Sequence, residues 1–132
     1  MARKRATVLE KKIAAMWPER DLEEIKAILG RYGAERETVW GRRRVHLAAL
    51  KLCDGDLDKL ARYVEMANRD YRDVVAFAEY PEEMRLGFVE MGKLSEAEAK
   101  AVRRRDKAQY QRWLKGRDQV GDTGFQNRAS DD

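Results

Sequence analysis

The stretch LAALKLCDGDLDKLARYVEMANRDYRDVV, residues 47–75, decides the fold class that this sequence predicts. Its first part is apolar on nearly every side of a helix, which is the pattern of a helix buried in a core. Asp54 and Gly55 end that run, and Asp56 is a favoured N-cap for a following helix. Apolar side chains then recur with helical spacing at Leu57, Leu60, Ala61, Val64 and Ala67. The stretch therefore predicts two consecutive helices, the first of them central to the fold.

Two interpretations of residues 57–80 remain open in the sequence. The polar run at 68–70 interrupts the pattern, and Asp70 and Asp73 are suited to cap and charge a further helix from 71 to 80. Alternatively, residues 57–78 form one helix, because their apolar positions stay in phase. We favour the break.

The rest of the chain also shows helical rather than strand periodicity, so we predict an all-α fold. Pro18 ends the first helix, and Pro81 is placed to open a short one. We expect this short helix to turn Met84, Phe88 and Met91 inward. The expected helices cover residues 5–16, 20–32, 35–53, 57–67, 71–80, 81–91 and 96–115.

These elements predict a small helical bundle of five to seven helices, with a basic C-terminal helix and a mobile tail. The core is expected to bury Leu47, Leu50, Leu60, Val64 and Val75 together. We divide the chain into an N-terminal helix or arm (1–17), a helical core domain (18–94), the basic C-terminal helix (95–116) and a flexible, polar, glycine-rich tail (117–132).

Composition narrows the class of protein. With 132 residues, of which 43% are hydrophobic, the chain can bury one core without a disulfide or a metal. Cys53 is the only cysteine, which excludes an internal disulfide and a cysteine-rich zinc site and favours a cytoplasmic protein. Because no run of 18 apolar residues occurs, we expect no contact with a membrane.

Catalytic and cofactor motifs are not evident. The single histidine, His46, precedes Cys53 by two helical turns, about 10 Å, which is too far for a direct hydrogen bond. The segment DGDLD at 54–58 begins like a calcium loop but lacks the Gly and Glu that complete one. We therefore expect a protein that is not an enzyme and that uses no cofactor.

Charge is arranged in blocks, although the formal net charge is only +4. Residues 74–99 carry six acidic and two basic side chains, whereas residues 100–117 carry eight basic and one acidic. In the second block, the Lys and Arg residues at 100, 103, 104, 107 and 115 follow one broad helical face, with Tyr110 and Trp113 between them. This helix is a candidate for phosphate contacts, or alternatively it lies on the acidic segment of its own chain.

Part of the opening stretch, LKLCDGDLDKLARYVEMANRDYRDVV, resembles the helix-turn-helix of Fis-type regulators. Gly55-Asp56 stands where those proteins have Gly-Asn, and Leu60-Ala61 stands in the place of their paired alanines. The resemblance implies a helix that enters a DNA groove. However, Glu65 replaces the turn glycine, and the segment in the recognition position carries two aspartates that would face phosphates unfavourably.

The arginine and tryptophan content favours a binding function. Arg42, Arg43 and Arg44 form a second basic cluster, and three tryptophans are many for a chain of this length. Both residue types are enriched at interfaces. We predict an interaction module for a protein partner or for a second copy of itself; the alternative is a nucleic-acid-binding protein that contacts phosphates through basic helices. The candidate binding residues are Arg42, Arg43, Arg44, Arg103, Arg104, Lys107, Trp113 and Lys115.

Overall fold

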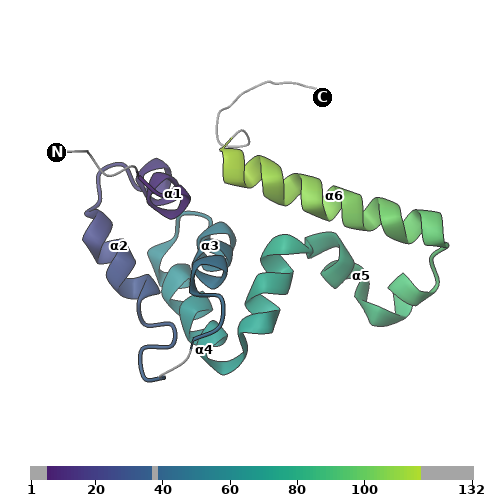
Figure 1. The fold of residues 1–132 in the computed structure, drawn as a ribbon, viewed down its shortest axis with the longest axis horizontal. Helices are drawn as coiled ribbons and strands as arrows, with labels where there is room; N and C mark the ends of the chain where they lie inside the picture. Colours follow the sequence, from purple (N-terminus) through teal and green to yellow (C-terminus); the bar gives the residue numbers. More distant parts are fainter. Residues whose placement is uncertain (1–5, 37–38, 117–132) are drawn as a thin grey trace. The chain divides into compact units, whose positions relative to one another are not determined.

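The computed structural model describes residues 6–36 and 39–116, and all regular secondary structure in these ranges is helical (Figure 1). The predicted all-α class and small bundle are therefore confirmed, while the tail predicted at 117–132 lies outside the described residues. None of the described helices combines the length and the apolar composition needed to cross a bilayer. The six helices are α1 (Val8–Met16), α2 (Leu22–Leu29), α3 (Arg42–Cys53), α4 (Leu57–Glu79), α5 (Pro81–Gly92) and α6 (Glu96–Lys115).

The chain divides into two compact units, Met1–Ala78 and Glu79–Asp132. In the first unit α1 packs against α2 and α3, and in the second α5 packs against α6. The division falls before α5, which packs with the basic helix α6.

Local sequence explains where several helices begin. Reciprocal capping boxes start α1, where Thr7 pairs with Glu10, and α6, where Ser95 pairs with Glu98. Asp56 precedes α4, and its carboxylate accepts hydrogen bonds from the backbone N–H groups two and three residues further on. These side chains satisfy amide groups that the first turn of a helix leaves without a backbone partner.

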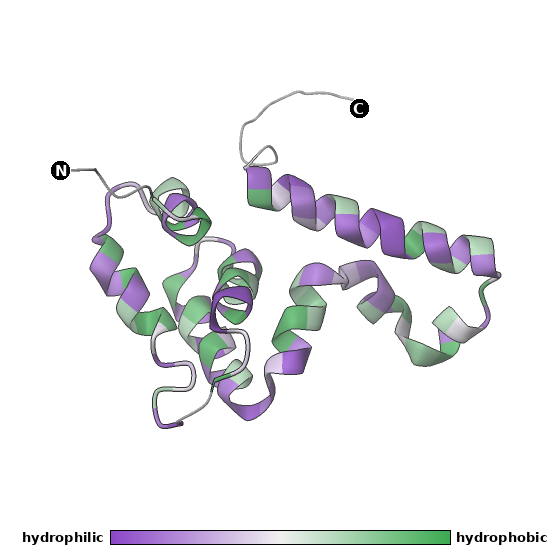
Figure 2. Cartoon of the chain, in the orientation of Figure 1, coloured by the Kyte–Doolittle hydropathy of each residue, from purple (hydrophilic) through white to green (hydrophobic). Residues whose placement is uncertain are grey.

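The first unit buries an apolar core to which all four of its helices contribute. Hydrophobic residues recur along each of these helices (Figure 2). Every residue of α3 from Val45 to Leu50 is buried, as the apolar run predicts. Trp17 donates a hydrogen bond from Nε1 to the carbonyl oxygen of Gly55 at 2.9 Å, which ties the end of α1 to the turn between α3 and α4. The predicted core residues are all buried, none more than 6% exposed: Leu47, Leu50, Leu60, Val64 and Val75.

The third helix starts at Arg42, not at residue 35 as predicted. Residues 31–35 form turns instead, and Gly33 has a φ of 69°, a conformation that glycine adopts without strain. A Cβ atom at Gly33 would lie 2.5 Å from the side chain of Val39, so no larger residue fits. The prediction failed because a distant side chain, Asn68, holds this turn. As a consequence, residues 42–44 form the first turn of α3.

Asn68 on α4 holds the turn with both ends of its amide. Its Oδ1 accepts a hydrogen bond from the backbone N–H of Gly33 at 2.7 Å, and its Nδ2 donates to the carbonyl oxygen of Arg31 at 3.0 Å. The guanidinium of Arg36 donates in turn to the backbone carbonyl of Asn68 at 2.6 Å. The segment after α2 is thus fastened to α4.

α4 is interrupted at Asp70, which confirms the break that the sequence favoured. The φ and ψ angles of Asp70 are −158° and 98°, so its backbone is extended. Its Oδ1 accepts hydrogen bonds from the backbone N–H of Arg72 at 3.1 Å and from the guanidinium of the same residue at 2.9 Å. These bonds hold the pKa of Asp70 below its usual value. Asp70 therefore caps the second half of α4, which carries Val74 and Ala78 into the core.

α5 is interrupted as well, which the sequence did not predict. Gly87 has φ and ψ angles of 83° and 170°, a combination that favours glycine. Phe88 follows the break and is 95% exposed, whereas Met84 and Met91 are half-buried. The expectation that Phe88 faces inward with the two methionines is wrong, because it assumed an unbroken helical period.

Replacing Leu50 with Ala should lower the free energy of unfolding by about 2–5 kcal/mol, because a fully buried side chain leaves a cavity. Leu52 on the same helix is only half-buried and provides a matched control, since the same replacement there should have a clearly smaller effect. Denaturant unfolding followed by circular dichroism measures both variants. Equal losses would show that α3 is not the centre of the core.

Candidate interaction surfaces

α6 divides its side chains between a buried row and an exposed row. Val102, Asp106 and Trp113 are buried, and Gln109 between them is half-buried. Their helical spacing places these four on one face. The opposite face carries four exposed cations, which we call the basic stripe: Lys100, Arg104, Lys107 and Lys115.

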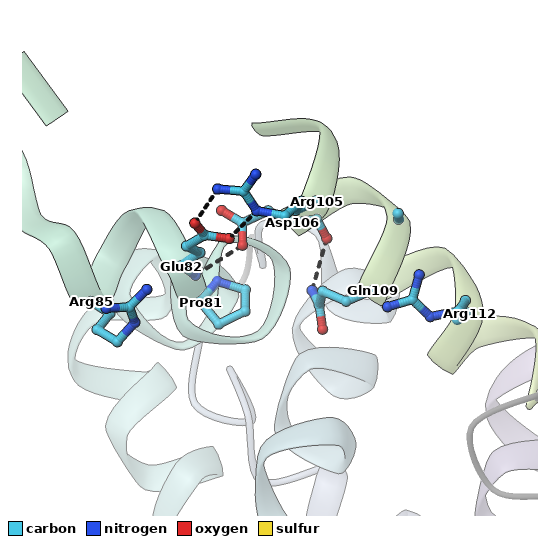
Figure 3. A pocket seen from close by; sticks show the side chains of 8 residues that line it. Pro81, Glu82, Arg85, Arg105, Asp106, Gln109 and Arg112 are labelled. Atoms are coloured by element: carbon cyan, nitrogen blue, oxygen red, sulfur yellow. Dashed lines mark hydrogen bonds and ion pairs between the residues drawn. The ribbon is translucent and has the colours of Figure 1, made fainter. Parts of the chain in front are cut away.

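Asp106 is the charged residue that joins α6 to α5. It is 1% exposed, and its two carboxylate oxygens accept hydrogen bonds from the backbone N–H groups of Glu82 and Glu83, at 2.8 and 3.1 Å (Figure 3). No side chain of α5 itself caps this helix end. Gln109 adds a hydrogen bond from Nε2 to the carbonyl oxygen of Asp106 at 2.9 Å. The only acidic residue between 100 and 115 thus serves as the N-terminal cap of a neighbouring helix.

Two arginines on the flanks of α6 bind the glutamates of α5. Arg105 forms two hydrogen bonds with the carboxylate of Glu82, one of them from Nε at 2.8 Å (Figure 3). These hydrogen bonds hold the pKa of Glu82 below its usual value. On the other flank, Nε of Arg103 lies 3.8 Å from Oε1 of Glu83. Part of the basic block is therefore neutralised by the acidic segment, as one of the sequence-based interpretations proposed.

The charges of the basic stripe are not neutralised by ion pairs within the described ranges. None of its four residues forms an ion pair within the described ranges, and the one acidic side chain in this part of α6, Asp106, points to the other side of the helix. α6 is hydrophilic along most of its length (Figure 2). The stripe extends over about 22 Å of helix axis, a length suited to several phosphates or carboxylates in a row.

A second surface lies in the first unit, where α3 begins. The indole of Trp40 stacks on the ring of Tyr71, with centroids 4.3 Å apart and planes inclined by 17°. The guanidinium of Arg44 lies 5.4 Å from the indole centroid, within the range of a cation–π interaction. Trp40 remains 43% exposed. We refer to Trp40 and Tyr71, together with the exposed Arg42, Arg43 and Arg44, as the aromatic–arginine cluster.

Two features of the backbone position this cluster. The hydroxyl of Tyr32, which is buried, donates a hydrogen bond to the carbonyl oxygen of Trp40 at 2.8 Å. Tyr71 is the first residue after the break at Asp70. Both rings are thus attached to well-defined points of the core, although Trp40 remains 43% exposed.

The positive charges of Arg42 and Arg43 stand at the N-terminus of α3. Cations at a helix N-terminus oppose the helix dipole, and α3 has no acidic residue in its first turn. Its N-cap position is held by Gly41, and no side chain caps it within the described residues. A negatively charged group placed here would therefore relieve a local repulsion.

The structure sorts the eight binding residues predicted from sequence by their surroundings. Arg104, Lys107 and Lys115 are brought together in the basic stripe, and Arg103 pairs with Glu83. Trp113, predicted as an exposed aromatic, is only 9% exposed and stacks on Tyr110, so it belongs to the packing of α6. The arginines at 42–44 lie together in the cluster.

The residues that suggested nucleophile chemistry are both buried. Burial lowers the pKa of His46 and raises the pKa of the Cys53 thiol. Cys53 is fully buried, and its thiol donates a hydrogen bond to the carbonyl oxygen of Leu50 at 3.2 Å. In the described part of the chain, no group of three or more His, Cys, Asp or Glu side chains is arranged to hold a metal ion.

Comparison with protein-family models, with curated proteins and with solved structures found no match.

Replacing Asp106 with Ala should loosen α5 specifically, because the backbone N–H groups of Glu82 and Glu83 lose their acceptors. A buried donor left without a partner costs about 1–3 kcal/mol. Amide hydrogen exchange should accelerate at Glu82 and Glu83 and remain unchanged in α3. Asp106→Asn keeps one carbonyl acceptor and should give an intermediate effect. Unchanged exchange at residues 82 and 83 in the Ala variant would show that the cap contributes little.

Proposed function

We propose that the protein is a macromolecular interaction module and that its aromatic–arginine cluster binds an acidic surface of a partner protein. One observation carries this proposal: an exposed indole is held in place by Tyr71 and Arg44 beside two further exposed arginines. Trp, Tyr and Arg are the residue types that contribute most to binding energy at interfaces. Since the stack exists before binding, few rotamers remain to be ordered when a partner covers it.

The charge of the cluster favours an acidic partner. Arg42 and Arg43 in the first turn of α3 oppose the helix dipole, and carboxylates would offset this effect. Arginine forks also bind carboxylates through two parallel hydrogen bonds. The partner surface that fits is therefore acidic, with an apolar area that covers the indole.

The arrangement of the rings favours a protein over stacked bases at this surface. Tyr71 and Arg44 both already lie over the ring of Trp40. A nucleotide base would have to displace one of them in order to stack on the indole. A protein side chain needs only the exposed edge of the ring.

A binding role rather than catalysis is supported by the burial of His46 and Cys53. A buried thiol with a raised pKa is a poor nucleophile, and a buried neutral imidazole has little access to a substrate. A cytoplasmic location, where a lone thiol stays reduced, fits the same residues and forms part of the proposal.

Trp40→Ala should weaken binding of the partner by roughly 30-fold or more, as the loss of a central interface tryptophan does. Arg42→Glu combined with Arg43→Glu should weaken it further, because the new charges repel acidic groups. Partners captured on the immobilised wild-type chain are identified by quantitative mass spectrometry, and the affinity of the purified partner is then measured by calorimetry.

Phe77→Ala is the matched control, because Phe77 lies in the same unit and is also 43% exposed. This variant should bind like the wild type. A partner that binds equally well to Trp40→Ala, or that is lost equally with Phe77→Ala, would contradict the proposed surface.

The basic stripe supports a second candidate function, binding to the phosphates of a nucleic acid. Its four cations lie on one face and form no ion pair within the described ranges, whereas Arg103 and Arg105 are held by glutamates. Contacts of this kind position a protein on a duplex without selecting a base sequence.

Four phosphate contacts predict a logarithmic salt dependence of duplex DNA binding with a slope of about −3.6. Arg104→Gln combined with Lys107→Gln should reduce this slope to about −1.8 and leave the unfolding transition unchanged. Arg105→Gln is the complementary control, since it removes the contact with Glu82 but no residue of the stripe. Fluorescence anisotropy with an arbitrary duplex measures the slopes. Absence of binding at low salt would eliminate this candidate.

A further inference from the structure

Phe88 is the most exposed large apolar side chain in the described part of the chain. It is 95% exposed, and its neighbour Val89 is 66% exposed. Exposing a whole phenylalanine side chain forgoes the favourable burial of its apolar surface. The positive φ of Gly87 turns it outward, so its exposure follows from the folded backbone of α5. A side chain presented in this way is expected to enter a contact with another molecule.

Phe88 projects from the surface of α5, and a hollow lies beside it. Residues of α5 line the hollow, among them Met84, Gly87 and Met91, and Arg103 of α6 closes one side. Methionine side chains adapt easily to an inserted ring. Phe88 and Val89 also border this hollow, so the projection and its receptor share one small patch of the second unit.

A patch of this kind fits a second copy of the same chain. In a two-fold symmetric contact both copies use the same surface. If residue i of the first copy contacts residue j of the second, then residue j of the first copy also contacts residue i of the second. A patch that carries both a projection and a hollow satisfies this condition by itself. Phe88 of each copy then enters the hollow of the other.

The charges at the rim of the patch are consistent with self-association. Glu83 lies 3.8 Å from Arg103, and Glu90 forms an ion pair with Lys93 at 3.1 Å. Both signs therefore border the apolar centre, so a copy rotated by 180° can place acidic groups opposite basic ones. A uniformly acidic or basic partner would be repelled by one half of this rim.

We infer that the Phe88 patch of α5 is the contact of a two-fold homodimer, in which Phe88 of each copy fills the Met84–Met91 hollow of the other. The contact uses residues of the second unit, whereas the aromatic–arginine cluster consists of residues of the first. The homodimer is thus independent of the proposed function, and either can fail alone.

Sedimentation equilibrium of the full chain from about 10 µM to about 1 mM tests the inference over the range where weak dimers are detected. The wild type should show a concentration-dependent dimer, and Phe88→Ser should remain monomeric at every concentration. Because Phe88 is almost fully exposed, this replacement should leave the thermal unfolding transition unchanged.

Two variants serve as controls. Tyr80→Ser changes another exposed aromatic residue of the same unit, 40% exposed, and should still dimerise. Trp40→Ala should dimerise as well, although it loses the partner protein of the proposed function. A monomeric wild type, a dimer that persists in Phe88→Ser, a dimer lost in either control, or assemblies that grow beyond two copies would each overturn the inference.

Discussion

The hydrogen bonds of Asn68 are the constraint on which the most distinctive surface of the molecule depends. One amide binds the N–H of Gly33 and the carbonyl of Arg31, and so fastens the segment after α2 to α4. With that segment held as a turn, α3 begins only at Arg42. The three arginines therefore occupy the first turn of a helix, next to an indole that stacks on Tyr71.

Asp106 has a comparable role in the second unit. Asp106 caps α5, so the only negative charge in the middle of α6 lies on its buried face. The same hydrogen bonds fix which face of α6 is buried. Arg103 and Arg105 then fall on the two flanks, within reach of Glu83 and Glu82. The four cations of the basic stripe are left on the outer face. A helix that looks uniformly basic in sequence is thus divided into a structural part and an exposed part.

Sequence periodicity was sufficient for the helical class and for the core, because burial of Leu50 and Leu60 depends mainly on local apolar patterns. The break at Asp70 was also predictable, since a favoured cap residue lies inside a polar run. The hydrogen-bond partners of Asn68 and Asp106 could not be predicted from the sequence, because each bond joins residues at least 23 positions apart. An isolated acid in a basic helix was the one available signal for Asp106. The stack of Trp40 on Tyr71 and the outward turn of Phe88 depend on non-helical backbone, which helical periodicity does not describe.

One aromatic residue of each proposed surface directly follows a break in a helix. Tyr71 follows the extended residue Asp70, and Phe88 follows Gly87, where the backbone is left-handed. At a break, the side chains that follow lose the phase that would turn them inward with the preceding stripe. An apolar residue can then be exposed at no cost to the packing of the core. Because the core and the surfaces use different residues, a change in either surface is expected to alter binding while the bundle stays folded.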